Sequence, residues 1–374
     1  MSNKHVHIVS FDVPWPDNYG GVIDVFHKVR HLHNAGWKIS LHCYEYGRGI
    51  SKKLNEFTSE VFYYKRNTGK TKLLSSKPYI VVSRDQEALL MRLQADRSPI
   101  LFEGIHTTLR LPELAQADRK TIVRAHNIEH EYYALLSRAE KNPFRRQYLK
   151  AESVKLKRYE SVLKEAGSIA AITENDHRYF SEKYHHSFHL PPFHSFDSVT
   201  TKTGYGDYYL YHANLSIAEN HQAAMWLVTE VLPLLKRPLY IAGQKPRQEL
   251  IVASRKAPLF KLIESPSSEE MTQLIQDAQV HLLPTFQPTG MKLKLLNALF
   301  CGRHVVVNSA MIQGTGLNTI CATADEAAAF AQLAEEHFQL EMDTAMIRQR
   351  EEFLQEYYSN KKGADLLTMM LQTS

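Results

Sequence analysis

The sequence predicts an α/β protein with two doubly wound domains, each built on a parallel sheet covered by helices. Its 374 residues exceed what one ordinary core accommodates. Short apolar runs alternate with amphipathic helical segments through both halves, and this alternation implies right-handed parallel crossovers. A stretch rich in histidine and proline, residues 184–197, interrupts the alternation near the middle. We therefore expect a domain linker there, and ligands at the carboxyl ends of the strands.

The first half opens with a strand pattern followed by a helix pattern. HVHIVSFDV reads as a strand, and Val22 to Ala35 has the spacing of an amphipathic helix that ends at Gly36. The next strand reads KISLHCYEY. The later apolar runs, with helical segments between most of them, are YIVVS, SPILFEG, KTIVRAHN and GSIAAIT.

The alternation restarts after the linker. DYYLYHANLS, PLYIAG, KLIES and VHLLP are strand patterns, and helical patterns cover Asn220 to Leu235 and Ser268 to Asp277. The stretch PTFQPTGMKLKLLNALFCGRHVVV then reads as a turn, a helix with lysines at its start, and a buried strand. From Asp325 to Gln372 the pattern is almost wholly helical, with a break near Gly363.

Composition and charge exclude several classes of protein. A content of 44% hydrophobic and 23% charged residues is typical of a folded soluble protein. Apolar runs such as Val305 to Val307 are far shorter than the roughly 18 residues of a membrane helix, and the N-terminus reads as a strand rather than a signal peptide. Three widely spaced cysteines argue against a disulfide framework. The net charge of +5 is too small to indicate nucleic acid, so we expect a cytoplasmic protein.

A basic helical segment runs from Arg145 to Arg158. Cations flank an apolar stripe there, as in helices that rest on an anionic membrane surface. A solvated helix face with interleaved glutamates, such as Glu152, explains the same pattern. The sequence leaves both interpretations open.

A glycine-containing turn follows the first strand. Asn18 leads into Gly20 and Gly21, and paired glycines let backbone approach a ligand at the start of the next helix. The full G-x-G-x-x-G spacing is missing, so an ordinary turn between strand and helix explains the motif equally well.

Polar residues gather at two further strand ends of the first half. His126 follows the strand TIVRA, and Glu103 and His106 follow ILF. An imidazole at a strand end can orient or deprotonate a hydroxyl near neutral pH. His126 and His130 are spaced like metal ligands, but a metalloprotease needs Glu where this chain has Asn127. We expect no metal at the histidine-rich linker either, because it has no cysteine and one nearby aspartate, Asp197.

Anion-binding features gather in the second half. Lys245 and Arg247 follow the strand that ends at Gly243, and two cations at a strand end suit a phosphate. A solvated helix start is the alternative and is the commoner case for isolated Lys and Arg. The helix start in the lysine-bearing stretch adds the backbone N–H groups of Gly290 and Met291, with Lys292 and Lys294 close by and no carboxylate in the turn. Two such features in one domain favour a diphosphate.

Four segments resemble family 4 retaining glycosyltransferases of the GT-B fold, and the resemblance covers nearly the whole chain. They are PDNYGGVIDVFHKVRHLHNAGWKISLHCY, RAHNIEHEYY, LYHANLSIAENHQAAMWLV and VHLLPTFQPTGMKLKLLNALFCGRHVVV. The resemblance implies two Rossmann-like domains that face a central cleft. Residues 1–190 would form the acceptor domain and residues 191–345 the donor-nucleotide domain, with helices in 346–374 packing back toward the first domain.

The chain departs from the family pattern in the donor segments. Thr289 and Asn297 occupy the positions of the family's two glutamates, which contact the donor sugar and the ribose. Asn214 and Glu219 occupy the positions of the usual Arg and Lys of the donor turn. By this resemblance Asn297 would hydrogen-bond the ribose, and the lysines and arginine of the second half would replace the missing cations.

The resemblance implies transfer of a hexose from a nucleotide-diphosphate sugar to an acceptor hydroxyl of a glycan or lipid-linked saccharide, with retention and without metal or further cofactor. His126 would contact the acceptor or donor sugar. Asn18, Gly20, Gly21, Glu103 and His106 would shape the acceptor side. A catalytically degenerate GT-B subunit that binds a sugar, a nucleotide or a partner is the alternative. A sugar-nucleotide epimerase fits the donor segments poorly.

Overall fold

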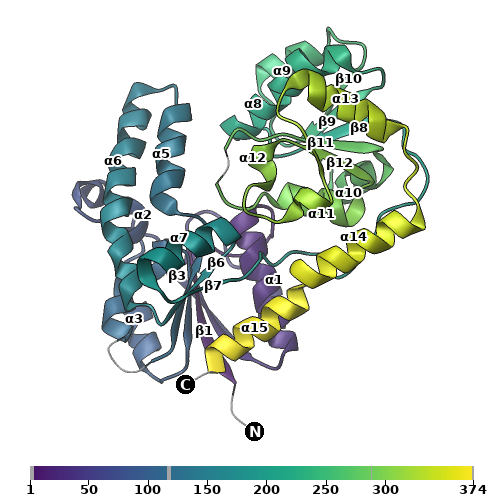
Figure 1. Cartoon of the computed structure of the whole chain (residues 1–374). Coiled ribbons are helices and arrows are strands. Elements are labelled where there is room, and N and C mark those ends of the chain that lie inside the picture. Colours follow the sequence, from purple (N-terminus) through teal and green to yellow (C-terminus); the bar gives the residue numbers. More distant parts are fainter. Residues whose placement is uncertain (1–3, 116–118, 288, 373–374) are drawn as a thin grey trace. The chain divides into compact units, whose positions relative to one another are not determined.

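The computed structural model describes residues 4–115, 119–287 and 289–372. Contacts divide these residues into two compact units (Figure 1). Unit 1 draws on Met1–Ser195, Thr289–Met291 and Tyr358–Ser374, and unit 2 on Phe196–Pro288 and Lys292–Tyr357. Each unit is a parallel sheet with helices on its faces, which confirms the predicted fold class. The domain limits after residues 190 and 345 stay predictions.

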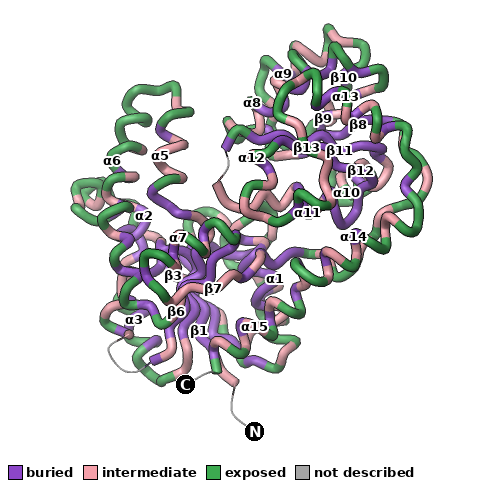
Figure 2. Tube along the Cα trace, viewed as in Figure 1, coloured by how far each residue is buried: buried purple, intermediate pink, exposed green. Residues whose placement is uncertain are grey.

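Unit 1 contains a seven-stranded sheet in the order β3-β2-β1-β4-β5-β6-β7. All its strand pairs are parallel, and the five inner strands are buried along most of their length (Figure 2). The bounds are β1 (His5–Ser10), β2 (Lys38–Glu45), β3 (Glu60–Lys65), β4 (Ile100–Glu103), β5 (Thr121–Ala125), β6 (Ser168–Ala171) and β7 (Ser187–His189).

Helices cover both faces of this sheet. Apolar residues of α1 and α15 share one core cluster, and those of α2, α3 and α7 share another. α5 and α6 form a helical pair, in which the Asn142 side chain caps α6 by accepting from the N–H groups of Phe144 and Arg145. The bounds are α1 (Gly20–Asn34), α2 (Tyr79–Val82), α3 (Glu87–Gln94), α4 (Leu111–Ala115), α5 (Glu129–Ala139), α6 (Pro143–Tyr159), α7 (Glu174–Tyr184) and α15 (Asn360–Gln372).

Three local details of unit 1 differ from the sequence patterns. The apolar run YIVVS forms helix α2, because Pro78 starts a single turn whose residues 80–82 are all buried. The pattern missed β3, an edge strand with charged ends and mostly half-buried side chains. Part of the predicted linker forms β7, which is three residues long and therefore too short to show a periodicity.

Unit 2 contains a six-stranded parallel sheet in the order β10-β9-β8-β11-β12-β13. The strands are β8 (Tyr209–His212), β9 (Leu239–Gly243), β10 (Phe260–Glu264), β11 (Val280–Leu283), β12 (His304–Val307) and β13 (Ala322–Thr323). The helices are α8 (Ala218–Trp226), α9 (Gln248–Ser254), α10 (Ser268–Asp277), α11 (Leu293–Cys301), α12 (Ser309–Ile312), α13 (Ala327–Phe338) and α14 (Thr344–Tyr357).

Helix ends in unit 2 follow local chemistry. Ser267 and Glu270 form a reciprocal capping box at α10. The helix predicted from Asn220 to Leu235 is interrupted, because the chain passes after Trp226 through a π turn and a 3₁₀ turn that contains Pro233. Among the described residues, no helix is both long and apolar enough to cross a membrane.

Candidate functional site

Each sheet has one point where the strand order reverses. In unit 2, β8 and β11 are neighbours, but the chain continues from β8 toward β9 on one side and from β11 toward β12 on the other. The loops from β8 to α8 and from β11 to α11 therefore meet at the carboxyl edge. Open α/β sheets bind ligands at this position.

Two lysine side chains from the start of α11, Lys292 and Lys294, lie at this switch point. Lys294 Nζ donates to Asn220 Oδ1 at 3.0 Å and to Tyr211 Oη at 3.2 Å. Lys292 Nζ lies 3.5 Å from Glu219 Oε1. We call these five residues, from β8, α8 and the start of α11, the lysine cluster. The sequence marked both lysines as anion ligands, and the structure brings them together.

The lysine cluster carries more positive than negative charge. Burial lowers the pKa of Lys294 to about 8, an effect that Glu219 opposes and Lys292 reinforces. Burial also lowers the pKa of Lys292, again against the effect of Glu219. Within the cluster two lysines thus share one carboxylate. An anionic ligand would supply the second negative charge.

The Glu219 side chain is held by a residue that follows strand β11. Thr285, just after β11, donates its hydroxyl to the Glu219 carboxylate. Asn308 in turn clamps the Thr285 backbone, accepting from its N–H at 3.0 Å and donating to its carbonyl at 2.7 Å. In the family pattern Glu219 occupies the position of a usual cation, so the sequence assigned it no role of its own. The sequence did not point to Thr285 or Asn308. Their one signal was a position beside a predicted strand end.

Asn214 shapes the loop between β8 and α8. Its Oδ1 accepts from the N–H of Ser216 at 3.1 Å and from the Ser216 hydroxyl at 2.7 Å. Its carbonyl accepts from Asn220 Nδ2 at 3.0 Å, which ties the loop to the lysine cluster. Asn214 therefore holds the turn that leads into α8, and its side-chain amide oxygen already accepts two hydrogen bonds.

The strand end at Gly243 has a packing reason for its glycine. A Cβ at Gly243 would lie 1.8 Å from the carbonyl oxygen of Ala213, so no larger residue fits. Lys245 and Arg247 follow in an exposed turn, and the Arg247 side chain reaches the Ser216 carbonyl at 3.5 Å. These two cations therefore lie beside the loop between β8 and α8 but outside the lysine cluster.

The helix at the lysine-bearing stretch begins later than its pattern predicts. α11 starts at Leu293 with Lys292 as its N-cap, so Gly290 and Met291 precede the first turn. Gly290 has φ of 65°, a conformation that favours glycine and not a helix. The N–H groups of the first turn therefore start at Leu293. Thr289 lies in the preceding bend and Asn297 is half-buried on α11.

The switch point of unit 1, between β1 and β4, lies beside a buried polar cluster of a different kind. Lys28 Nζ is 2.9 Å from Asp24 Oδ2 and 2.7 Å from Glu103 Oε1. Arg124 Nη2 is 3.0 Å from Asp24 Oδ1, and His126 Nε2 is 3.1 Å from Glu103 Oε2. We call these five residues the ion-pair cluster. Two acids and two permanent cations balance one another, and His126 adds a hydrogen bond.

The carboxylates of the ion-pair cluster stay ionised despite their burial. Burial raises the pKa of Glu103, but Lys28 and His126 outweigh it, so the pKa lies below its usual value. The pKa of Asp24 is lowered likewise, because Arg124 and Lys28 outweigh burial. Asp24, Glu103 and His126 are close enough to hold a metal ion. The acids are already paired with cations, so the donor set fits an ion-pair network better than a metal centre.

The acceptor-side assignments of Glu103 and His106 stay predictions, and the structure shows the surroundings of both side chains. Glu103 is fully buried and accepts a hydrogen bond from His126 Nε2. His106 packs against Phe11 with ring centroids 5.6 Å apart, and burial lowers its pKa well below the ordinary value, which keeps it neutral. Phe11 also contacts His126 edge-on at 5.3 Å. Of Glu103, His106 and His126, the last combines a polar partner with partial exposure, its side chain being 10% exposed.

The glycine-containing turn is pinned by Arg48. This guanidinium donates to Asn18 Oδ1 at 3.0 Å and to the carbonyl of Val13 at 2.8 Å. α1 starts at Gly20, and a Cβ on Gly21 would lie 2.6 Å from the Phe11 ring. Gly21 therefore has a packing role, while the first turn of α1 contains no acidic residue that would repel an anion.

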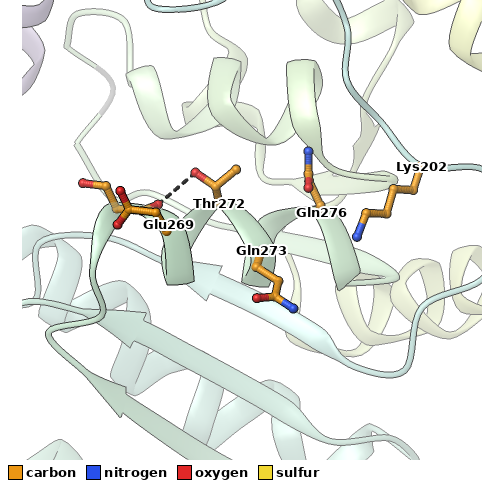
Figure 3. A pocket seen from close by; sticks show the side chains of 6 residues that line it. Lys202, Glu269, Thr272, Gln273 and Gln276 are labelled. Atoms are coloured by element: carbon orange, nitrogen blue, oxygen red, sulfur yellow. Dashed lines mark hydrogen bonds between the residues drawn. The ribbon is translucent and has the colours of Figure 1, made fainter.

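An open depression of about 510 Å³ lies along α10 (Figure 3). None of the predicted site residues lines it. Lys202, at one end, forms an ion pair with Asp277 at 2.7 Å. Its lining consists of Lys202, Ser268, Glu269, Thr272, Gln273 and Gln276.

Comparison with known proteins gives this geometry a context. Residues 207–339 match the family described as Glycosyl transferases group 1. A protein of Klebsiella pneumoniae, described as an uncharacterized 44.6 kDa protein in the cps region, is 24% identical over 330 residues, which cover 83% of this chain and 84% of that protein.

Solved structures share the fold over the whole length. A glycosyltransferase from Rickettsia africae is 11% identical, with 100% of both chains covered and a TM-score of 0.65. Anabaena HepE, solved in complex with UDP and glucose, is 11% identical, with 98% of this chain and 99% of that chain covered and a TM-score of 0.67. TarM is 9% identical, with 99% of both chains covered and a TM-score of 0.70. The chain has the GT-B fold, and its residues 207–339 match the family Glycosyl transferases group 1.

Proposed function

We propose that this chain is a retaining hexosyltransferase. It would move a hexose from a nucleotide-diphosphate sugar to an acceptor hydroxyl of a glycan or lipid-linked saccharide. The observation that carries the proposal is the excess positive charge of the lysine cluster at the switch point of a glycosyl transferases group 1 domain.

The lysine cluster supports a reaction in which the nucleoside diphosphate is the leaving group. When the bond between the anomeric carbon and the phosphate oxygen breaks, negative charge grows on the diphosphate. We propose that Lys292, Lys294 and the backbone N–H groups at the start of the nine-residue helix α11 stabilise that charge. We propose that these groups suffice without a metal ion or a further cofactor. Asn297, one turn further along α11, would hydrogen-bond the ribose.

The ion-pair cluster supports a role for His126 in the same reaction. Glu103 accepts from His126 Nε2 and so fixes the ring. The new bond forms between the anomeric carbon and the acceptor oxygen, which gives up its proton. We propose that His126 contacts the acceptor or the donor sugar, and that the turn from Asn18 to Gly21 shapes the acceptor side.

The relatives support the substrate class. HepE was solved with UDP and glucose, and the Klebsiella pneumoniae protein is described by its place in a cps region. We therefore propose a cytoplasmic enzyme of polysaccharide biosynthesis. α6 would touch an anionic membrane when the acceptor is lipid-linked, since Phe144 is 86% exposed beside Arg145 and Arg146.

Calorimetry with UDP- and GDP-hexoses tests the donor site. We expect one nucleotide sugar to bind the wild type, and Lys294→Ala and Asn297→Ala to weaken or abolish that binding. Lys202→Ala, which removes a surface lysine of the same unit, is the matched control. Unchanged binding in both site variants would overturn the assignment.

Nucleotide release with candidate glycan acceptors then tests the activity. We expect release to depend on the acceptor, and NMR of the product to show the anomeric configuration of the donor. Donor binding without release for any acceptor would favour the degenerate subunit. A product of inverted configuration would refute the retaining mechanism.

A further inference from the structure

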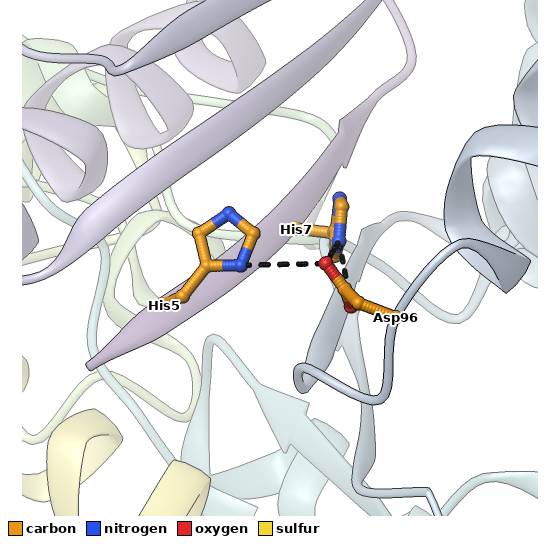
Figure 4. Close-up of side chains that lie close together, drawn as sticks. All are labelled: His5, His7 and Asp96. Atoms are coloured by element: carbon orange, nitrogen blue, oxygen red, sulfur yellow. Dashed lines mark hydrogen bonds and ion pairs between the residues drawn. The ribbon is translucent and has the colours of Figure 1, made fainter. Parts of the chain in front are cut away.

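A second polar cluster lies at the opposite edge of the unit 1 sheet. His5 and His7 stand two residues apart at the amino end of β1, so their side chains point to the same face. Asp96, in the bend after α3, faces both imidazoles (Figure 4). His126 and the ion-pair cluster lie at the carboxyl edge. The reaction proposed above makes no use of these three residues.

The three side chains converge on a common point. His7 Nε2 lies 3.1 Å and His5 Nδ1 lies 3.6 Å from the same carboxylate oxygen, Asp96 Oδ2. One ligand atom from each residue lies within 4.8 Å of the others. Zinc bonds of about 2.0–2.2 Å in tetrahedral geometry separate ligand atoms by roughly 3.3–3.5 Å. The observed separations therefore admit a metal ion after small side-chain movements.

Neighbouring groups hold the other ring nitrogens. His5 Nε2 lies 2.9 Å from Ser40 Oγ, and His7 Nδ1 lies 3.0 Å from His42 Nε2. His42 Nδ1 is in turn 2.9 Å from the Tyr64 hydroxyl. Metal-binding histidines donate their second N–H to such a partner, which turns the other lone pair toward the metal.

The carboxylate is held by its other oxygen. Asp96 Oδ1 accepts from the N–H of Ser98 at 2.8 Å, and Arg119 Nη2 lies 3.3 Å from it. Oδ1 also lies 3.2 Å from His7 Nε2, so His7 faces both carboxylate oxygens and Oδ2 is the oxygen near both imidazoles. The Ser98 hydroxyl lies 2.8 Å from His5 Nδ1 and would have to rotate away when a metal binds.

We propose that His5 Nδ1, His7 Nε2 and Asp96 Oδ2 bind a divalent transition metal ion of the zinc type. Two imidazoles and one carboxylate form a donor set that zinc accepts, with water as the fourth ligand. The Asp96 side chain is 41% exposed, which leaves the site open to solvent. The metal would fasten the first strand to the turn before β4 and would take no part in sugar transfer. Without metal, His7 donates its Nε2 proton to Asp96.

Zinc titration of the full-length, chelator-treated chain tests the proposal. We expect one Zn²⁺ per chain by calorimetry and a higher melting temperature when Zn²⁺ is present. His5→Ala and Asp96→Asn should each weaken binding by about tenfold or more and remove the thermal shift. Co²⁺ in place of Zn²⁺ should give visible absorption bands that both variants lose.

The control is His185→Asn, which removes an exposed histidine of unit 1 at a left-handed position that asparagine tolerates. It should bind Zn²⁺ as the wild type does. Should Asp96→Asn fail to fold, His5→Ala still decides, because the His5 side chain is partly exposed. Absence of stoichiometric Zn²⁺ binding, or binding unchanged in His5→Ala, would overturn the site.

Discussion

The two switch points of this chain hold polar clusters of opposite design. In the ion-pair cluster, Lys28 and Arg124 neutralise Asp24 and Glu103, and the network is complete without a ligand. In the lysine cluster, Lys292 and Lys294 share Glu219, so positive charge is left over. The difference teaches that buried charges can be balanced within the fold, as around His126, or left with an excess of one sign, which is why we propose an anion site at the second cluster alone.

The largest effect is expected from opening the ion-pair cluster. Lys28→Met leaves two buried carboxylates with one guanidinium, and we expect the free energy of unfolding to fall by about 3–5 kcal/mol. Urea denaturation followed by circular dichroism measures the change. The control is Lys53→Met, which removes a surface ion pair with Glu56 and should cost less than about 1 kcal/mol. Equal losses in the two variants would contradict a tightly coupled buried network.

Removing Glu219, the single acid of the lysine cluster, should lower the stability of the free protein and strengthen the binding of an anion. Glu219→Gln leaves two buried lysines without a carboxylate, so we expect a loss of roughly 1–3 kcal/mol in the free energy of unfolding. Inorganic pyrophosphate should then raise the melting temperature of the variant more than that of the wild type. Glu230→Gln, at an exposed position shortly after α8, is the control. A smaller pyrophosphate shift in Glu219→Gln would argue against an anion site.

The lowered pKa of Lys294 predicts two opposite pH dependences. Its pKa falls from 10.5 in the unfolded chain to about 8 in the folded one. Between these values the unfolded chain binds more protons, so the stability difference between wild type and Lys294→Met should shift in favour of the wild type as pH rises through this window.

Donor binding should weaken as pH rises through about 8, because the Lys294 ammonium that would meet the phosphate loses its proton there. Calorimetry at pH 7 and pH 9 measures this, with Lys294→Met as the control whose remaining affinity should change less. Affinity that is equal at both pH values in the wild type would show that Lys294 does not meet the phosphate.

The smallest effect is expected from removing the hydrogen bond between Thr285 and Glu219. Thr285→Val keeps the volume but removes the hydroxyl that donates to Glu219, and we expect a loss of about 1 kcal/mol in stability with a weaker donor affinity. Thr229→Val removes an exposed hydroxyl that bonds only within its own helix, and should change stability by less than about 0.5 kcal/mol. A donor affinity that does not change in Thr285→Val would show that Glu219 needs no such fixing.

The sequence predicted the fold because strands and helices follow from the local periodicity of apolar residues. The alternation of apolar runs with helical spacing marked most strands and helices, and Gly36 marked the end of the first helix. The two edge strands of unit 1 were not predicted, since β3 is half-buried and β7 has three residues. The sequence also singled out Lys292, Lys294 and His126 as residues with a chemical role.

Pairing between distant residues was decided by tertiary structure alone. By the family pattern Glu219 marked only a missing cation, and the structure shows that it lies beside Lys292. Thr285 had no sequence signal except its position at a strand end, and the structure shows that its hydroxyl donates to Glu219. Asp96 is 89 residues from His7 in sequence. Periodicity reports only on neighbours along one strand or helix, whereas a switch point joins loops that the crossover topology brings together. The sequence therefore determined which side chains stand at each strand end. The packing of the sheets decided which of these side chains form ion pairs and hydrogen bonds with one another.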